Sequence, residues 1–294
     1  MVEKKKIAFV LYRAWAYEIY QEILAFQKEN PNFLIPALIT TPSAEFSFSE
    51  SNSHIYVVEG NDGNSIDKIL AENDIDVVFY YGWSWIVKEP TLSRYLCMCL
   101  HPSPLPKYRG GSPIQNQIIA GEVISAVSVF KMGVGIDDGD VYAQASISLE
   151  GSLTDILGRV AITGTRITKR FIEDLLSSDL VFIPQNSLKD SPPHKRRKAN
   201  ESEIKLKDLA ITPYIKIYNM VRALADPYPN AFIVFPISGK TLYIQEIERC
   251  DEVSIDALVI NNGYQQITAN TQSPIYICLV DGFARITKYR VEKN

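Results

Sequence analysis

Long apolar runs alternate with amphipathic segments over the first half of the chain. Residues 7–12 read I-A-F-V-L-Y, a continuous apolar run that is typical of a parallel strand buried on both faces. Residues 16–27 then carry apolar side chains at helical spacing. The same reasoning predicts further strands at 33–40, 76–81 and 96–100 and a helix at 65–72. Strands separated by helices in this way predict an α/β fold with a Rossmann-like, doubly wound, mostly parallel sheet.

The pattern continues to about residue 176, but the connections change. Residues 113–120 have a helical pattern, and 154–176 is a long periodic run, as in a helix that covers a sheet. Between them, 125–131 and 141–149 have the composition and alternation of strands. Because the short acidic turn D-D-G-D joins these two runs, we expect a hairpin that carries its carboxylates at the tip.

The composition changes after the long helix. Residues 187–200 read S-L-K-D-S-P-P-H-K-R-R-K-A-N, a polar, basic, proline-containing stretch that is typical of a linker. A short helix is predicted at 213–224. Short β runs follow: F-I-V-F-P, T-L-Y-I-Q-E-I, A-L-V-I, Q-Q-I-T-A, I-Y-I-C-L-V and A-R-I-T-K-Y-R. They predict a small all-β barrel or sandwich of roughly 80 residues. We therefore expect a main domain at 1–186, a linker at 187–212 and a small C-terminal β domain at 213–294.

Composition and charge are those of an ordinary globular protein. Hydrophobic residues make up 46% of the 294 residues and charged residues 22%. The net charge of −4 and the pI of about 5.5 give no long-range attraction for a phosphate backbone, which disfavours a dedicated nucleic-acid binder. No apolar run reaches 18 residues, and M-V-E-K-K-K leads into a strand without a signal-peptide core. We expect a cytoplasmic protein with no membrane partner.

Two common kinds of site have no signature in the sequence. The first predicted strand is followed by Y-R-A-W-A-Y and not by G-x-G-x-x-G, so the usual dinucleotide site is not expected, and a P-loop is absent as well. The four cysteines, at positions 97, 99, 250 and 278, form neither a disulfide framework nor two pairs at zinc spacing. We expect no metal ion.

The best candidate chemistry lies between the fourth predicted strand and the acidic turn. His101 ends the strand and is followed by P-S-P-L-P-K-Y-R-G-G, in which prolines restrict the backbone. A lone histidine at a strand end is more often a simple cap. Here the acidic turn V-G-I-D-D-G-D follows, and doubly wound sheets bind ligands at the carboxyl ends of their strands. Together these features favour a functional role for His101.

The two motifs resemble a known family. H-P-S-P-L-P-K-Y-R-G-G-S-P-I-Q followed by V-G-I-D-D-G-D is similar to the formyltransferases that use N10-formyltetrahydrofolate, which include sugar N-formyltransferases and methionyl-tRNA formyltransferase. The resemblance covers about residues 5–180 and resumes at V-R-A-L-A-D-P-Y-P-N-A-F, 221–232. It implies the formyltransferase fold, with 1–186 as the catalytic domain, and N10-formyltetrahydrofolate as co-substrate.

The resemblance also implies roles for particular residues. The family's catalytic histidine and aspartate fall on His101 and Asp137. His101 would donate a hydrogen bond to the oxyanion of a tetrahedral intermediate, and Asp137 would hold His101 charged or accept the proton of the attacking amine. The residues implied to bind folate are Trp83, Trp85, Ile86, Val87, Asp137, Gly139 and Asp140. Those implied to bind the acceptor are Ser103, Tyr108, Arg109, Gly110 and Gln115. Two alternatives stay open: either tryptophan could belong to the core, and Asp138 and Asp140 could be solvated turn residues.

One position departs from the family pattern. The family has an asparagine two residues before the histidine, where this chain has Cys99. Loss of one oxyanion donor typically lowers kcat by about 10²–10³, and a thiol is a weak donor. The enzyme could be slow, another group could substitute, or the chemistry could have changed. A nucleophilic role for Cys99 is the less favoured reading, because a buried cysteine usually acts as a small apolar residue.

The sequence favours a small acceptor over tRNA. In the tRNA enzyme a basic insertion follows the second strand, whereas residues 40–54 here contain no Lys or Arg. The basic run at 195–198 reads more simply as a solvated linker. We expect a nucleotide-linked amino sugar, with Tyr218 or Tyr228 stacking on the base. The alternatives are a methionyl-tRNA formyltransferase and, because of Cys99, a weakly active or inactive folate-binding homologue. Apolar β edges in the C-terminal part are compatible with a homodimer.

Overall fold

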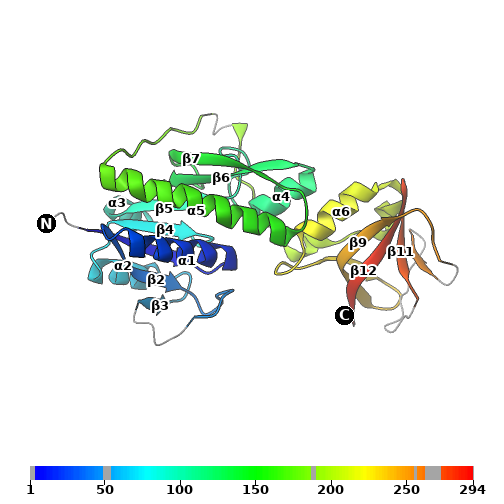
Figure 1. The fold of residues 1–294 in the computed structure, drawn as a ribbon. Coiled ribbons are helices and arrows are strands. Elements are labelled where there is room, and N and C mark those ends of the chain that lie inside the picture. Colours follow the sequence, from blue (N-terminus) through cyan, green and yellow to red (C-terminus); the bar gives the residue numbers. More distant parts are fainter. Residues whose placement is uncertain (1–3, 49–53, 187–189, 255–256, 262–272, 294) are drawn as a thin grey trace. The chain divides into compact units, whose positions relative to one another are not determined.

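A computed structural model describes the chain as two compact units (Figure 1). The residues it describes are 4–48, 54–186, 190–254, 257–261 and 273–293. The first unit comprises Met1–Pro113, Ile124–Glu150 and Thr154–His194. The second comprises Ile114–Val123, Gly151–Leu153 and Lys195–Asn294. The domain boundaries expected from composition, at 187 and 213, stay predictions.

The first unit contains a seven-stranded, mostly parallel sheet with the order β3-β2-β1-β4-β5-β6-β7. The strands up to β5 pair in parallel, whereas β5–β6 and β6–β7 are antiparallel. The strands are β1 (Lys5–Leu11), β2 (Phe33–Thr40), β3 (Ile55–Val57), β4 (Val77–Tyr81), β5 (Leu96–His101), β6 (Ile124–Lys131) and β7 (Val141–Ser148). The predicted α/β fold and the predicted hairpin are confirmed.

Helices cover both faces of this sheet. Alternate side chains of a strand point to opposite faces, and Phe9 of β1 contacts Tyr20 with ring centroids 5.4 Å apart, while Phe79 of β4 contacts Phe171 at the same distance. On the other face, Val10 and Tyr80 pack with a cluster that includes three apolar residues of α2. The helices of this unit are α1 (Ala14–Glu29), α2 (Gly63–Glu72), α3 (Glu89–Arg94) and α5 (Leu153–Ser177).

The second unit is built around a five-stranded sheet with the order β10-β11-β12-β9-β8. Its longest pairing joins β9 and β12 in antiparallel register. The elements are α4 (Pro113–Ala120), η2 (Ala199–Ser202), η3 (Leu206–Ile211), α6 (Tyr214–Ala223), β8 (Ala231–Phe235), β9 (Lys240–Cys250), β10 (Leu258–Ile260), β11 (Ile275–Leu279) and β12 (Gly282–Lys293). Among the described residues of this second unit there is a single sheet and not the two sheets of a sandwich. The predicted β run Q-Q-I-T-A lies outside the described residues.

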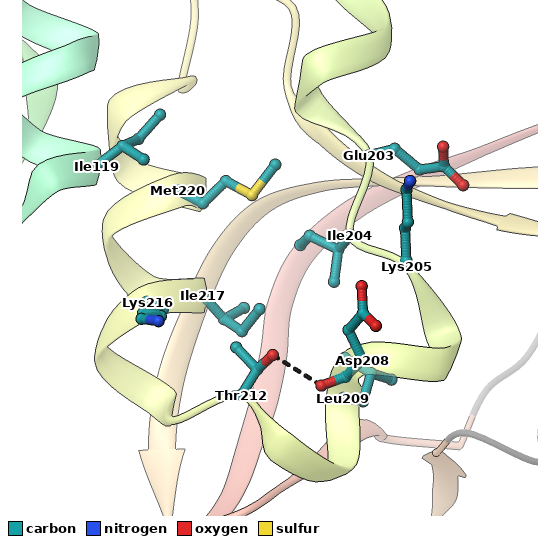
Figure 2. A pocket seen from close by; sticks show the side chains of 10 residues that line it. All are labelled: Ile119, Glu203, Ile204, Lys205, Asp208, Leu209, Thr212, Lys216, Ile217 and Met220. Atoms are coloured by element: carbon teal, nitrogen blue, oxygen red, sulfur yellow. Dashed lines mark hydrogen bonds between the residues drawn. The ribbon is translucent and has the colours of Figure 1, made fainter.

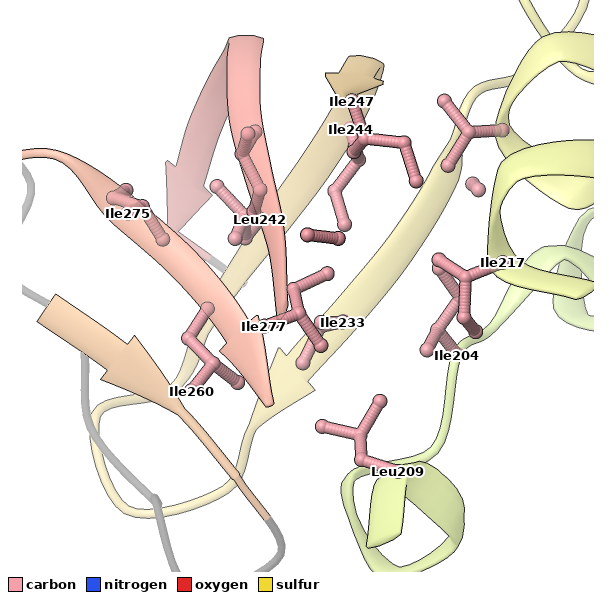
Figure 3. Packing of buried hydrophobic residues seen from close by; sticks show 14 of the residues in the cluster. Ile204, Leu209, Ile217, Ile233, Leu242, Ile244, Ile247, Ile260, Ile275 and Ile277 are labelled. Carbon is pink, nitrogen blue, oxygen red and sulfur yellow. The ribbon is translucent and has the colours of Figure 1, made fainter. Parts of the chain in front are cut away.

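The core of the second unit is rich in isoleucine, because β-branched side chains suit a pleated surface that packs against helices. Figure 3 shows Ile233 and Ile277 from the sheet facing Ile204 and Ile217 from the helical side. Leu209 of η3 is 1% exposed and joins the same cluster. The C-terminal unit therefore has a hydrophobic core of its own, as expected for an independent domain.

A pocket of about 490 Å³ opens on the helical side of this core (Figure 2). Its wall includes Ile204, Leu209 and Ile217 of the core cluster. The hydroxyl of Thr212 donates to the backbone carbonyl of Asp208 at 2.7 Å and so shapes one side. The other lining residues are Ile119, Glu203, Lys205, Asp208, Lys216 and Met220. The pocket thus combines an apolar floor with charges of both signs.

The packing of α5 on the sheet gives a stability prediction. A Cβ added at Gly164 would lie 2.5 Å from the Leu100 Cδ1 atom and 2.7 Å from the Ile19 Cδ1 atom. Gly164→Val should therefore lower the free energy of unfolding by about 1–3 kcal/mol through overpacking. Gly158 lies on the same helix with no atom near its added Cβ, so Gly158→Ala should raise it by about 0.5–1 kcal/mol. Urea denaturation measures both; equal midpoints for the two variants would contradict this packing.

Candidate active site

The site lies at the carboxyl end of β5, on the face that α2 covers. Cys97 belongs to the cluster on that face, so Cys99 and His101, at alternate positions, point the same way. The last residue of β6, Lys131, pairs with Met98, three residues before the end of β5. The acidic turn follows Lys131 and folds back towards the carboxyl end of β5. As a result the Asp137 carboxylate reaches His101.

His101 is held at both ring nitrogens. Its Nδ1 atom lies 3.3 Å from Oδ2 of Asp137, and its Nε2 atom lies 2.9 Å from the backbone carbonyl oxygen of Tyr108. The side chains of His101 and Asp137 are only 8% and 20% exposed. Both partners of the ring are hydrogen-bond acceptors, so this arrangement suits an imidazole that donates from both nitrogens. The sequence prediction that these two residues meet agrees with this geometry.

Asp137 connects the acidic turn to the loop that follows β5. Its φ angle is +48°, a left-handed conformation that aspartate tolerates better than most residues. Besides facing His101, its Oδ2 atom accepts a hydrogen bond of 2.7 Å from the backbone N–H of Gly110. Gly110 has a φ of +89°, and a Cβ there would lie 2.3 Å from the carbonyl oxygen of His194. Only glycine fits this close approach.

The proline-containing loop is fixed by polar side chains of its own and by Ser128 of β6. The Ser103 hydroxyl donates to the Lys107 carbonyl at 2.7 Å, and the Ser128 hydroxyl donates to the Ser103 carbonyl at 2.6 Å. Tyr108 has a φ of +58°, and its carbonyl accepts from the His101 ring. The Arg109 guanidinium donates to the Ile136 carbonyl at 3.1 Å. These contacts make Ser103, Tyr108 and Arg109 part of the framework; their roles in acceptor binding stay predictions.

The segment 190–194 also packs on this loop, which the sequence did not reveal. Arg109 donates to the carbonyl of Ser191 from Nε at 3.1 Å and from Nη2 at 2.7 Å. The Ser191 hydroxyl donates to the Pro106 carbonyl, and the His194 ring stacks on Tyr108 with an interplanar angle of 14°. The sequence predicts only a polar linker at 187–200. Because these residues bind through backbone carbonyls and polar side chains, they leave no apolar pattern by which to recognise them.

The loop after β4 forms an aromatic cluster. The rings of Trp83 and Trp85 lie 4.7 Å apart, and Tyr12, after β1, lies 5.3 Å from Trp85. The Trp85 ring packs on the backbone of Gly60, where a Cβ would lie 2.2 Å from it. Both tryptophans are thus partly buried in the protein. Ile86, by contrast, is 84% exposed. Exposed apolar side chains occur in the acidic turn too: Val134 and Ile136.

The acidic turn is tightly packed around its glycines. A Cβ on Gly139 would lie 1.7 Å from the Lys131 carbonyl oxygen, so only glycine fits. The Asp138 carboxylate folds back over Gly133 and Gly135, and its Oδ1 atom is buried without a hydrogen-bond partner among the described residues. Asp138 is therefore not the freely solvated turn residue that the sequence left open. The side chain of Asp140 is exposed.

Cys99 lies on the same strand face as His101, close to the Asp137 carboxylate. Burial, and next the Asp137 carboxylate, raise the pKa of its thiol well above the ordinary value. The nearest acceptor for its Sγ atom is the carbonyl of Leu100, at 3.7 Å. A thiol that stays protonated is a poor nucleophile, which agrees with the prediction that Cys99 acts as a small apolar residue.

Gln115 is the one predicted acceptor-binding residue that does not belong to the first unit. It lies on α4, in the second unit, where it is 3% exposed. Its Nε2 atom has no hydrogen-bond partner among the described residues. Across the described part of the chain, no group of three or more His, Cys, Asp or Glu side chains could hold a metal ion, and no helix is long and apolar enough to cross a membrane.

Comparison with known proteins identifies the family. The family model described as formyl transferase matches residues 32–164. A methionyl-tRNA formyltransferase of Rickettsia typhi is 31% identical over 238 residues, which cover 79% of this chain and 70% of that protein. This chain belongs to the formyl transferase family. Alignments to the first relatives span between 57% and 70% of the relatives' own length. The members of this family are one-carbon transferases, and their formyl donor is N10-formyltetrahydrofolate.

Solved structures share the fold of this chain. HypX of Aquifex aeolicus, solved in complex with tetrahydrofolic acid, matches 96% of this chain and 43% of its own with a TM-score of 0.70 and 16% identity. A 4-N formyltransferase from Francisella tularensis matches 78% of this chain and 92% of its own with a TM-score of 0.65 and 20% identity. At these identities the likeness concerns the fold.

The raised thiol pKa values predict an order of reactivity among the cysteines. Burial raises the pKa of Cys97 to about 12, and that of Cys99 is also raised, so at pH 8 both remain thiols. Cys99 is partly exposed, as are Cys250 and Cys278. The raised pKa of its thiol should nevertheless make Cys99 react more slowly with iodoacetamide than those two cysteines, as peptide mass spectrometry would show. Asp137→Asn should speed modification of Cys99 but not of Cys97, because Asp137 raises the pKa of Cys99 alone. Fast alkylation of Cys99 in the unsubstituted chain would contradict its environment.

Proposed function

We propose that this protein transfers the formyl group of N10-formyltetrahydrofolate to a primary amine. The observation that carries the proposal is the His101–Asp137 pair, held at the end of β5 in a chain that belongs to the formyl transferase family. The pair is nearly enclosed by protein, where its hydrogen bonds and charges act more strongly than in water.

The residues around the pair fit a folate. A buried acceptor atom of the acidic turn, Oδ1 of Asp138, has no hydrogen-bond partner among the described residues. A pterin ring carries N–H and NH₂ donors that such acceptors can bind. Its flat faces suit the exposed apolar side chains of Ile86 and Ile136. We therefore assign folate binding to the loop 83–87 and to the acidic turn, including Gly139 and Asp140.

The catalytic pair has two tasks in this reaction. N10-formyltetrahydrofolate supplies an activated formyl carbon. His101 donates a hydrogen bond from Nε2 to the formyl oxygen, which requires that this N–H turns from the Tyr108 carbonyl to the substrate, and so stabilises the negative charge that develops there. Asp137 fixes the orientation of the imidazole through the 3.3 Å contact. It would also accept the proton that the attacking amine loses, and N10 of the departing tetrahydrofolate takes up a proton as the bond to the formyl carbon breaks. In this scheme no thiol chemistry is required of Cys99.

For the acceptor we propose a nucleotide-linked amino sugar. The segment after β2 has no cation in 40–54, and its Glu45 pairs with Arg13. Phosphate-rich partners need several free cations, whereas four cations of the C-terminal sheet lie beside carboxylates. These pairs are Arg249–Asp281, Arg285–Glu248, Lys288–Glu246 and Arg290–Glu292. The second candidate is the initiator methionyl-tRNA, which the names of the sequence relatives favour.

The acceptor is tested by direct competition. The protein is incubated with N10-formyltetrahydrofolate and either a panel of nucleotide-linked amino sugars or Met-tRNA, and formylated products are followed by mass spectrometry and gel mobility. We expect formylation of at least one sugar, with a KM that changes little with salt. Formylation of tRNA alone, with a KM that rises steeply with salt, would replace the sugar by the second candidate. Folate binding without turnover on any amine would overturn the enzymatic proposal itself.

The catalytic pair is tested by substitution. His101→Ala should lower kcat by at least about 10²–10³, because the hydrogen-bond donor to the formyl oxygen is lost. Asp137→Asn should also lower kcat, since an amide can neither hold an imidazolium nor accept a proton. His54→Ala, at an exposed histidine, is the matched control and should leave kcat unchanged. Full activity of His101→Ala would overturn the mechanism.

Substitution of Cys99 shows whether its thiol acts as a small apolar residue or has a chemical role. Cys99→Asn should keep or raise kcat, because an amide is a better donor than a protonated thiol. Cys99→Ala should stay near the unsubstituted rate, since the thiol contributes only a weak hydrogen bond. Initial rates with saturating folate and amine measure both. Complete loss of activity in both variants would instead indicate a chemical role for the thiol.

A further inference from the structure

The segment after α5 returns to the acidic turn. Ile183 and Val141 exchange two backbone hydrogen bonds, each of 2.8 Å, and form an isolated antiparallel bridge. Val141 is the first residue after the turn, so this bridge aligns 183–186 with it. Gln185, two residues beyond the bridge, is thereby brought to the backbone of the turn.

The Gln185 side chain binds the turn on both sides of Asp138. Its Nε2 atom donates to the carbonyl of Asp137 at 2.9 Å and to the carbonyl of Gly139 at 2.7 Å. One amide nitrogen thus uses its two N–H groups on two carbonyls that are two residues apart. The Asp137 carbonyl directly follows the Cα atom from which the catalytic carboxylate extends. A contact there restrains the ψ angle of a residue whose φ is left-handed.

Stability alone does not account for this contact. The Oε1 atom of Gln185 is buried and has no hydrogen-bond partner among the described residues. A buried polar atom without a partner destabilises the folded state, so the amide is an unfavourable choice if packing is its only purpose. A carboxylate in its place would repel the two carbonyl oxygens. An amide is the neutral group that offers two donors from one atom.

We propose that Gln185 is a positioning residue for formyl transfer. By holding the carbonyls of Asp137 and Gly139, it sets the turn so that the Asp137 carboxylate faces Nδ1 of His101. It acts through Asp137 and contacts no reacting atom. The proposal rests on the proposed function of the His101–Asp137 pair.

The first test needs no substrate. The chain has three histidines, so the ¹⁵N and ¹H resonances of the His101 ring can be assigned by comparison with His101→Ala. Gln185→Leu keeps most of the side-chain volume and removes the donors. We expect the Nδ1 signals of His101 to shift in Gln185→Leu with the thermal midpoint nearly unchanged. In Gln245→Leu, which removes a glutamine of the C-terminal sheet, they should not shift. Unchanged His101 signals in Gln185→Leu would overturn the proposal.

The second test uses the pH dependence of turnover. Gln185→Leu should lower kcat by about 10- to 100-fold, since small misplacements of catalytic groups are costly, with a much smaller change in the KM for the amine. Gln185→Glu should be most impaired at high pH, where the carboxylate repels the carbonyls, and should recover as pH falls and the protonated acid donates one hydrogen bond. A purely structural role would give parallel pH profiles, and that result would overturn the proposal.

The two tests keep the proposals separable. If the unsubstituted protein formylates no amine, the proposed function fails, yet the ring resonances of His101 still report whether Gln185 sets the pair. If formylation is found but Gln185→Leu and Gln245→Leu turn over equally well, the proposed function stands and the positioning role is wrong.

Discussion

The site depends on one carboxylate that joins two loops. Oδ2 of Asp137 faces the His101 ring and also accepts the backbone N–H of Gly110, so the acidic turn and the proline-containing loop are fixed by the same atom. The His101 ring is in turn held by the Tyr108 carbonyl. Removing this carboxylate would leave both loops without their common partner, which is why the geometry of each depends on the other.

The sheet supplies the rigid base for this contact. Strands buried on both faces fix the direction of every second side chain, and the alternation that buries Leu100 under α5 turns Cys99 and His101 towards the opposite face. The antiparallel β6–β7 hairpin then returns the acidic turn to the same place. The order of strands thus brings together residues that the chain keeps far apart.

Much of the first sheet and the two central residues of the site could be predicted from the sequence, for identifiable reasons. Continuous apolar runs predicted β1, β2, β4 and β5, and the spacing of two motifs predicted His101 and Asp137. The strand Ile55–Val57 and the helix Glu89–Arg94 are too short to carry a pattern. Gln185 and Ser191 were missed because polar side chains that bind backbone carbonyls have no periodicity. The environment of Cys99 needed the fold, since its pKa depends on burial and on a carboxylate from another element.

The hydrogen bonds that define the site join residues remote in sequence. Gly110 and Asp137 are 27 residues apart, Asp137 and Gln185 are 48 apart, and Arg109 and Ser191 are 82 apart. Closing loops of this length carries an entropic cost that is repaid only when the whole unit is ordered. We therefore expect the His101–Asp137 contact to form late in refolding, after the helices and local hairpins.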